Sequence, residues 1–284
     1  MEKELAIITG ADGGMGQEIT KELARAGYPV IMACKNPQKA VSLCERIKKE
    51  TGNAQIEIRE INLASLASVN AFTSQLLKEG RPISRLMNNA GILTTPIRKT
   101  EDGLETIISV NYVGPYMLTR QLLPLMRPGS RIVNTVSCSS IIGKIEPKVF
   151  FEKGKSGSFF RIPVYGNSKL ALHLFTQELA KQIQERGSTA NASDPGIVDT
   201  NMITMQAWFD PITDVLFRPF IKTPAQGAAT AVHLALSEEA EGKNGCCYVN
   251  CKEKKQSKRM QYHPLQKQLW EDTERLIRDK GFHL

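Results

Sequence analysis

Short apolar runs alternate with helix-like segments along most of this chain of 284 residues. We expect strands at Leu5–Thr9, Val30–Cys34, Ile56–Ile61, Arg85–Asn88, Arg131–Val136, Thr189–Ala192 and Tyr248–Asn250. We expect helices at Gln17–Ala26, Gln38–Glu50, from Ser65 onward, and at Leu104–Met126 and Ser168–Glu185. Strands joined through helices by short connections predict a parallel sheet that is covered on both faces. Because such crossovers are right-handed, the sheet is expected to be doubly wound.

The remaining organisation indicates one domain. No internal repeat or low-complexity linker divides the chain, so residues 1–284 are predicted to form a single three-layer α/β/α domain with a Rossmann fold. Two segments interrupt the alternation, an inserted loop at 146–163 and an apolar flap at 201–223. Long loops in compact domains are usually functional or mobile. The flap carries aromatic side chains, and we expect it either to cover a hydrophobic ligand or to pack against the protein's own core.

Composition excludes several classes of function. With 41% hydrophobic and 23% charged residues, the chain has the balance of a globular protein. The net charge is +8, but the densest basic run, 252–259, interleaves no aromatic residues, so no nucleic-acid partner is expected. The chain has no run of about twenty apolar residues and no signal-peptide pattern, so we expect no integral membrane segment and a cytoplasmic location. Neither the six cysteines nor the histidines have metal-ligand spacing, so no metal is expected.

A glycine-rich turn lies between the first expected strand and the first expected helix. Glycines there permit a tight turn and let the backbone approach a pyrophosphate closely. The helix that follows would present free N–H groups and the positive end of its dipole to that anion. The turn therefore predicts a dinucleotide-binding cradle formed by Gly10, Asp12, Gly13, Gly14, Met15 and Gly16.

The end of the second strand indicates which dinucleotide is bound. In such folds an acidic residue there accepts hydrogen bonds from the ribose 2′-hydroxyl of NAD(H), whereas a basic residue accommodates the 2′-phosphate of NADP(H). This chain has Lys35 and no acid at that position. We therefore predict NADP(H) rather than NAD(H), with Lys35 pairing the 2′-phosphate. The alternative is a lysine that only faces solvent.

A tyrosine and a lysine four residues apart predict a proton-transfer pair. On a helix this spacing places Tyr165 and Lys169 on one face, one turn apart. A free phenol, with a pKa near ~10, exchanges protons poorly at neutral pH. A cation held beside it favours the phenolate and lowers that pKa. The spacing alone is common in helices, so its meaning depends on the residues around it.

Taken in order, these motifs resemble those of the short-chain dehydrogenase/reductase family. The resemblance rests on Thr9–Gly16, Asn88-Asn89-Ala90-Gly91, Asn111, Ser137, Tyr165-x-x-x-Lys169 and Pro195-Gly196, and it runs from about Leu5 to about Gly245. Within the family, the chain looks most like the retinol-dehydrogenase-like branch, on the residues Ala33-Cys34-Lys35, Leu63-Ala64-Ser65-Leu66 and Phe220-Ile221-Lys222-Thr223.

The resemblance implies a role for each matching residue. Tyr165 would be the general acid or base, Lys169 would lower its pKa and bind the nicotinamide ribose, and Ser137 would donate a hydrogen bond to the substrate oxygen. Asn111 would hold a water that links Lys169 to solvent. Further cofactor contacts are implied for Asn62, Leu63, Asn89, Ala90, Gly91, Pro195, Gly196, Val198 and Thr200. The family often pairs the helix of Tyr165 and the preceding helix between subunits, which implies a homo-oligomer.

Several positions leave alternatives or depart from the family pattern. Ser139 is the alternative substrate-binding serine, because in an extended segment it would point the same way as Ser137. Asn62 replaces a common Asp, and Asp12-Gly13 replaces a more usual Asn followed by Ser or Thr. The segment between Ser137 and Tyr165 is longer than in compact members, which implies an inserted loop beside the substrate entrance.

These residues predict an NADP(H)-dependent oxidoreductase that interconverts a carbonyl and an alcohol on a small to medium hydrophobic substrate. Retinoid-, steroid- or lipid-like aldehydes and ketones are the candidates that the resemblance suggests. The alternative is an NADP(H)-binding sensor or scaffold without turnover, although such proteins usually lose the tyrosine or the lysine. A third alternative, epimerisation or dehydration on the same fold, typically needs an added substrate-gripping domain.

Overall fold

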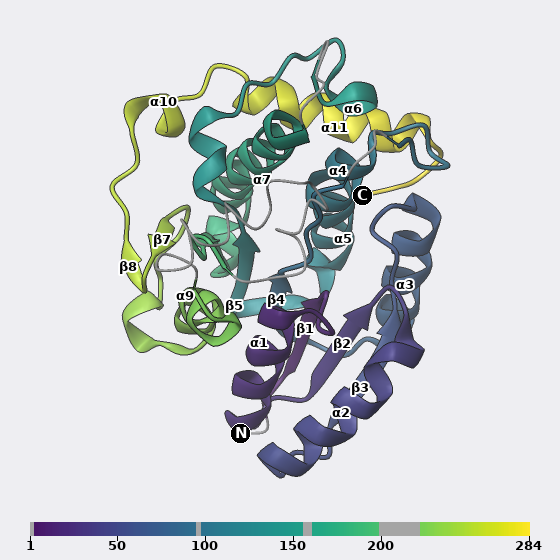
Figure 1. Cartoon of the computed structure of the whole chain (residues 1–284), viewed down its shortest axis with the longest axis vertical. Helices are drawn as coiled ribbons and strands as arrows, with labels where there is room; N and C mark the ends of the chain where they lie inside the picture. The colour runs from purple at the N-terminus through teal and green to yellow at the C-terminus, as the bar shows by residue number, and fades with distance from the viewer. Residues whose placement is uncertain (1–2, 95–97, 156–160, 199–221) are drawn as a thin grey trace, which may run out of the picture.

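The computed structural model describes residues 3–94, 98–155, 161–198 and 222–284 (Figure 1). Within these ranges eight strands form one sheet in the order β3-β2-β1-β4-β5-β6-β7-β8. All neighbouring strands are parallel except the β7–β8 hairpin. The strands are β1 (Leu5–Thr9), β2 (Val30–Cys34), β3 (Ile56–Glu60), β4 (Ile83–Asn88), β5 (Met126–Thr135), β6 (Thr189–Asp194), β7 (Cys247–Val249) and β8 (Lys252–Glu253). The predicted doubly wound α/β sheet is confirmed.

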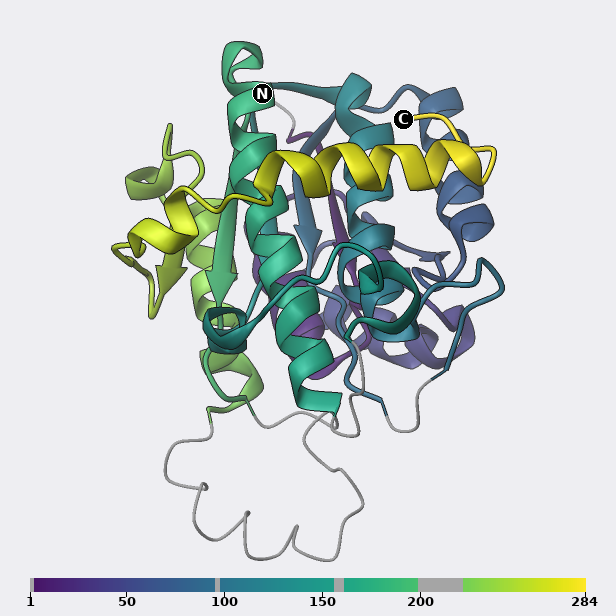
Figure 2. The same cartoon turned by 90° about the horizontal axis from the view of Figure 1, so that it is seen from above.

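Successive side chains of the central strands point into two separate apolar layers. In β1, Leu5 and Ile7 belong to one buried cluster, whereas Ala6 and Ile8 belong to the other. The first cluster is covered by α3 (Leu66–Glu79), α5 (Gly114–Leu122), α7 (Arg161–Ile183) and α11 (Gln266–Asp279), and the second by α1 (Gly14–Arg25), α2 (Pro37–Thr51) and α9 (Pro224–Leu236). Figures 1 and 2 show these helices on the two sides of the sheet.

The chain changes direction across the sheet between β1 and β4. The strands β1 to β3 run outward on one side of this point, and β4 to β7 run outward on the other. In doubly wound sheets, ligands bind beyond the carboxyl ends of the strands at this point. The glycine-rich turn after β1 and the Asn89–Gly91 segment after β4 lie there.

The two segments that interrupt the alternation differ partly from expectation. The helix of Tyr165 begins at Arg161, so Pro163 lies in its first turn, where a missing N–H costs no helical hydrogen bond. The short helix α6 (Phe150–Lys153) also lies inside the expected loop 146–163, of which positions 156–160 are outside the described residues. Positions 201–221 of the expected flap also lie outside the described residues. Of the two remaining flap residues, Thr223 is the N-cap of α9.

No helix within the described ranges is long and apolar enough to cross a membrane. Among the same residues, no group of three or more His, Cys, Asp or Glu side chains is arranged to hold a metal ion. The cytoplasmic location stays a prediction.

Candidate active site

The glycine-rich turn forms a cradle at the amino end of α1. Gly10 adopts a φ of +62°, and its N–H donates to Ala33 of β2 at 2.9 Å. A Cβ on Gly16 would collide with the carbonyl oxygen of Gly10, so this contact requires glycine. The N-cap residue Gly13 offers no side chain, so no side chain of the described residues caps the first N–H groups of α1, and they can face an anion. Binding of a dinucleotide by Gly10–Gly16 stays a prediction.

Asp12, in the turn after β1, lies next to Cys34, the last residue of β2. Burial raises the pKa of the Cys34 thiol to about 12, and the Asp12 carboxylate contributes to this rise. The Asp12 carboxylate therefore lies against this buried thiol. Lys35 is exposed directly after β2. Its position fits the predicted contact with a 2′-phosphate.

The Asn89–Gly91 segment packs directly on the cradle. Asn89 donates from its side chain to the Thr9 carbonyl at 3.1 Å, and the Thr9 hydroxyl accepts from the N–H groups of Asn89 and Ala90. A Cβ on Gly10 would lie 3.1 Å from Ala90. The loops after β1 and β4 are thus held together as one wall.

Asn62 and Leu63 follow β3 and have different surroundings. Asn62 accepts from the Ala64 N–H at 3.1 Å through its side-chain oxygen, which leaves its amide NH₂ for other partners. Leu63 is buried, and its carbonyl accepts from the Ser109 hydroxyl at 3.3 Å. Asn62 can therefore face a ligand with its side chain, whereas Leu63 anchors the loop.

Lys169 and Asn111 converge on Gly91. A Cβ on Gly91 would lie 3.2 Å from the Lys169 Nζ and 3.6 Å from the Asn111 Oδ1. The Lys169 Nζ donates to the Thr135 carbonyl at 2.7 Å. Asn111 lies on a π-helical segment, Ser109–Val113. Its side-chain oxygen accepts from the Ile92 N–H at 2.8 Å, and its side-chain NH₂ donates to the Ile92 carbonyl at 3.0 Å. Such π-segments often occur at functional sites.

Tyr165 and Ser137 come together at the end of β5. Burial raises the pKa of Tyr165 to about 12, and a hydrogen bond with Ser137 opposes this shift. Burial lowers the pKa of Lys169 to about 8, and the Lys169 Nζ lies 5.7 Å from the centre of the Tyr165 ring. Desolvation therefore raises the phenol pKa, and Lys169 does not lower it as the sequence led us to expect. Tyr165 holds its proton at neutral pH.

The segment after Ser137 does not continue as a strand. Residues Cys138–Ile142 form a 3₁₀-helix that the Ser137 hydroxyl caps by accepting from the Ser139 N–H at 3.2 Å. The alternation that placed Ser139 on the same side as Ser137 therefore does not apply. The Ser139 hydroxyl is buried and has no hydrogen-bond partner among the described residues. A substrate contact of Ser139 remains a prediction.

The Pro195–Gly196 turn follows β6 and starts with an acidic residue that the motifs did not single out. Asp194 is 4% exposed, and its Oδ1 accepts from the Gly196 N–H at 3.0 Å. Its charge raises the pKa of both Tyr165 and Lys169. The sequence signal was available, since a carboxylate directly precedes the Pro-Gly pair. Val198 is buried beyond the turn, and Thr200 lies outside the described residues.

A buried ion pair fixes the start of the Tyr165 helix and was also missed. Arg161 pairs with Glu105, and the side chains are 4% and 0% exposed. Arg161 also donates from Nε to the Thr94 carbonyl at 3.0 Å. Because Arg161 lies one turn before Tyr165, this pair connects the catalytic helix to the loop after β4.

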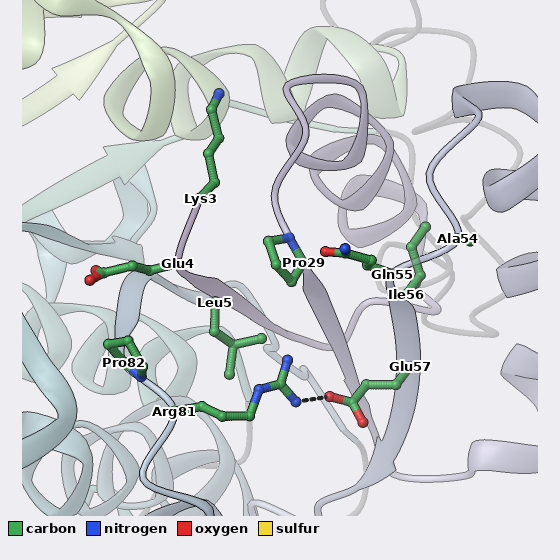
Figure 3. A pocket seen from close by; sticks show the side chains of 10 residues that line it. All are labelled: Lys3, Glu4, Leu5, Pro29, Ala54, Gln55, Ile56, Glu57, Arg81 and Pro82. Carbon is green, nitrogen blue, oxygen red and sulfur yellow. Dashed lines mark hydrogen bonds and ion pairs between the residues drawn. The ribbon is translucent and has the colours of Figure 1, made fainter. Parts of the chain in front are cut away.

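A polar groove at the other end of the sheet is separate from this site. It lies at the amino ends of β1 and β3, and its lining includes Lys3, Glu4 and Gln55 (Figure 3). Within it Arg81 already pairs with Glu57 at 2.5 Å. The cradle and the Tyr165–Lys169 pair lie at the carboxyl ends of the strands, so the groove takes no part in the site.

The comparisons with known proteins agree with this arrangement. The sequence model described as short chain dehydrogenase matches residues 4–208. The chain belongs to the short-chain dehydrogenase/reductase family of oxidoreductases. It is 37% identical to retinol dehydrogenase 12 of Mus musculus over 269 residues, 94% of this chain and 84% of that protein. It is 35% identical to human polyprenol dehydrogenase over 275 residues, 94% and 82% of the two chains. The predicted likeness to the retinol-dehydrogenase-like branch is confirmed.

Solved structures show the same fold. An uncharacterized protein from Mycobacterium paratuberculosis superposes with a TM-score of 0.78 at 27% identity, covering 97% of this chain and 93% of the other. A short chain dehydrogenase from Burkholderia cenocepacia, solved in complex with NADP, superposes with a TM-score of 0.69 at 23% identity, covering 87% and 95%. Both superpose over most of this chain, so they share its fold.

Proposed function

We propose that this protein is an NADP(H)-dependent oxidoreductase that interconverts a carbonyl and an alcohol on a hydrophobic substrate. The observation that carries the proposal is the meeting of Tyr165, Lys169 and Ser137 beside a glycine cradle. The cradle fits a dinucleotide, because its turn is tight at Gly16 and no described side chain caps the first N–H groups of α1. Lys35, exposed at the end of β2, supports NADP(H) over NAD(H).

The chain's own residues supply binding and proton transfer. The nicotinamide, when bound, supplies or accepts the hydride. Tyr165, with its pKa raised to about 12 by burial, carries its proton at neutral pH and donates it to the substrate oxygen in the reduction direction. Ser137 donates a hydrogen bond to the same oxygen as charge develops there. Lys169 holds its ammonium against Thr135 and Gly91, which places a positive charge on the cofactor side of the phenol.

The surroundings of the site support an apolar substrate. Ile141 and Ile142, on the 3₁₀-helix after Ser137, are 53% and 65% exposed. Ile162, in the first turn of the Tyr165 helix, is 45% exposed, and Ile197, directly after the Pro195–Gly196 turn, is 44% exposed. Isolated exposed apolar residues are common, but here each adjoins a segment of the site. Since similar proteins are named for retinol and polyprenol, we propose long apolar alcohols and aldehydes as the substrate class.

A substrate panel tests the proposal. The purified protein is offered apolar aldehydes, ketones and alcohols while NADPH and NADH absorbance are followed in parallel. We expect turnover with NADP(H), and Tyr165→Phe should lower kcat by about a hundredfold to ten-thousandfold because it removes the proton donor. Thr94→Val, a buried hydroxyl outside the reacting set, is the matched control for folding.

Each outcome discriminates between the candidates. Turnover that depends on Tyr165 supports the oxidoreductase. Tight NADPH binding without turnover over the whole panel favours the sensor or scaffold. Turnover that Tyr165→Phe leaves unchanged contradicts the assigned mechanism.

A further inference from the structure

The Pro195–Gly196 turn is held by Lys222, the first described residue after positions 199–221. The Lys222 Nζ donates to the Pro195 carbonyl at 2.8 Å, and the Lys222 N–H donates to the Ile197 carbonyl at 2.8 Å. Val198 and Lys222 also pair as a parallel β-bridge. Residue 222 therefore binds this turn with both its backbone and its side chain.

The lysine side chain passes directly over the glycine of the turn. Gly196 has a φ of +77°, and a Cβ at that position would lie 3.3 Å from the Lys222 Nζ and 3.4 Å from its Cε. From the other side, the Asp194 Oδ1 accepts from the Gly196 N–H at 3.0 Å. The turn is thus held at its carbonyl by Lys222 and at its N–H by Asp194.

The ammonium is itself fixed by the β7–β8 hairpin. The Lys222 Nζ donates to the Asn250 Oδ1 at 2.6 Å. Asn250 and Cys251 form the hairpin turn with φ values of +50° and +60°, the left-handed pair that a two-residue hairpin favours. The Cys251 N–H donates to the Thr230 hydroxyl of α9 at 3.2 Å. The acceptor for Lys222 is therefore anchored to two elements.

We propose that Lys222 is a positioning residue for hydride transfer: clamped by Asn250, it fixes the Pro195 carbonyl and with it the turn that lies against the nicotinamide. The inference rests on the proposed function and on the cofactor contact that the family resemblance implies for Pro195 and Gly196. A small shift of a positioned group slows a reaction strongly even where binding changes little. Loss of the clamp should therefore affect the hydride step more than cofactor affinity.

The test removes the side-chain ammonium of Lys222 and keeps the length of the side chain and the backbone hydrogen bond to Ile197. In Lys222→Met, we expect kcat to fall roughly tenfold to a hundredfold, while the Kd for NADPH changes by less than about threefold. The primary isotope effect on kcat with NADPH deuterated at the transferred position should rise. In the protein without ligand, amide hydrogen exchange in peptide 194–198 should become faster, because the turn opens more readily.

Companion variants separate positioning from folding. Asn250→Gly keeps the positive φ and removes the acceptor, so it should change kcat in the same direction. Lys222→Arg restores a donor and should recover part of kcat. Lys243→Met removes an exposed lysine that pairs with Glu253, away from the turn, and should leave every measurement unchanged.

The results have distinct meanings. A lower Tm with unchanged kcat, isotope effect and exchange at 194–198 would overturn the proposal, since that pattern is purely structural. If wild-type protein neither binds NADPH nor turns over, the proposed function fails. The exchange measurement on the unliganded protein still reports whether Lys222 holds the turn.

Discussion

The charges of Tyr165 and Lys169 depend on burial and on one carboxylate. Burial raises the pKa of Tyr165 to about 12 and lowers that of Lys169 to about 8, while Asp194 raises both. Removing the Asp194 charge should therefore lower both pKa values. We predict that Asp194→Asn moves the alkaline decline of carbonyl reduction to lower pH by roughly half a unit to one unit. The rise of alcohol oxidation, which needs the phenolate, should move in the same direction.

The pH profiles of kcat in both directions measure this shift. Asparagine keeps an oxygen that can accept from the Gly196 N–H, so the turn should stay in place. His173 and Cys247 also face Asp194, but burial lowers the pKa of His173 and raises that of Cys247 to about 12. Asp279→Asn, an exposed change at the end of α11, should leave the profile unmoved. If the alkaline decline of carbonyl reduction stays in place or moves to higher pH in Asp194→Asn, Asp194 does not raise the pKa values of Tyr165 and Lys169.

The preference for the cofactor depends on one exposed side chain. Lys35 follows β2 directly, where a carboxylate would repel a 2′-phosphate. Lys35→Asp should lower the ratio of kcat/KM for NADPH over NADH by about two orders of magnitude. Lys49→Asp makes the same charge change at the other end of α2 and should leave the ratio unaltered. An unaltered ratio in Lys35→Asp would mean that Lys35 faces solvent and does not contact the 2′-phosphate.

Among the elements, those with strong periodic patterns were predictable and those set by tertiary contacts were not. Buried runs such as Val30–Cys34 identified their strands from local sequence. Pro163 suggested a loop, but the buried Arg161–Glu105 pair helps to fix the helix start before it. The 3₁₀-helix after Ser137 depends on a side-chain cap. Because the segment is not extended there, Ser139 need not point to the same side as Ser137. The ion pair joins residues far apart in the sequence, and the cap depends on one side-chain hydrogen bond, and apolar periodicity reports neither.

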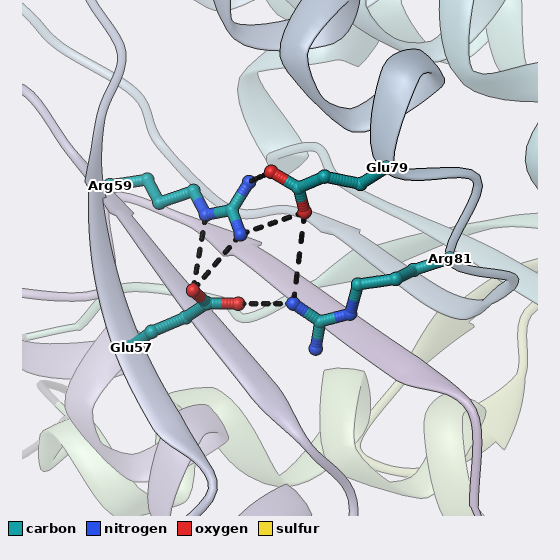
Figure 4. Close-up of polar contacts among 4 residues, drawn as sticks. All are labelled: Glu57, Arg59, Glu79 and Arg81. Carbon is teal, nitrogen blue, oxygen red and sulfur yellow. Dashed lines mark hydrogen bonds and ion pairs between the residues drawn. The ribbon is translucent and has the colours of Figure 1, made fainter.

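Two arginines and two glutamates form a network of ion pairs at the edge strand β3. Arg59 pairs with Glu79 at 2.7 Å and with Glu57 at 3.0 Å, and Arg81 pairs with Glu57 at 2.5 Å (Figure 4). Hydrogen bonding from Arg59 lowers the pKa of Glu79. A carboxyl with a lowered pKa stabilises the fold above its unfolded pKa, and this contribution is lost as pH falls through the folded value.

This network predicts a pH-dependent cost for losing Arg59. The Arg59 side chain is only 14% exposed, so Arg59→Met should lower the free energy of unfolding by about 1 to 2 kcal/mol at neutral pH. The loss should shrink at acidic pH, as the Glu79 carboxyl is protonated below its lowered pKa and no longer pairs with Arg59. Arg81→Met, with a side chain 40% exposed, should cost less than about 0.5 kcal/mol. Urea unfolding at both pH values measures the difference, and an equal cost at both would contradict this account.

At the scale of the whole molecule, α11 covers the outer face of α5 and α7 (Figure 2). Trp270 stacks on Phe175 with ring centres 5.8 Å apart, and the Arg120 guanidinium lies 4.7 Å from the centre of the Trp270 ring. The Tyr112 hydroxyl and the Thr273 hydroxyl are 2.7 Å apart. This helix was not among those expected from the sequence. It lies over the two helices through which the expected homo-oligomer would form. The oligomeric state stays a prediction.

We therefore predict that α11 keeps the chain from pairing through α5 and α7. Trp270→Ala should lower the free energy of unfolding by about 3 to 5 kcal/mol and expose the apolar face beneath it, so the variant should associate where the wild type does not. Lys267→Ala, on the outer side of α11 with a side chain 85% exposed, should change neither property. Light scattering and urea unfolding measure the two effects. A wild-type dimer that Trp270→Ala weakens would mean that α11 forms the interface, because a covering helix would give the opposite response.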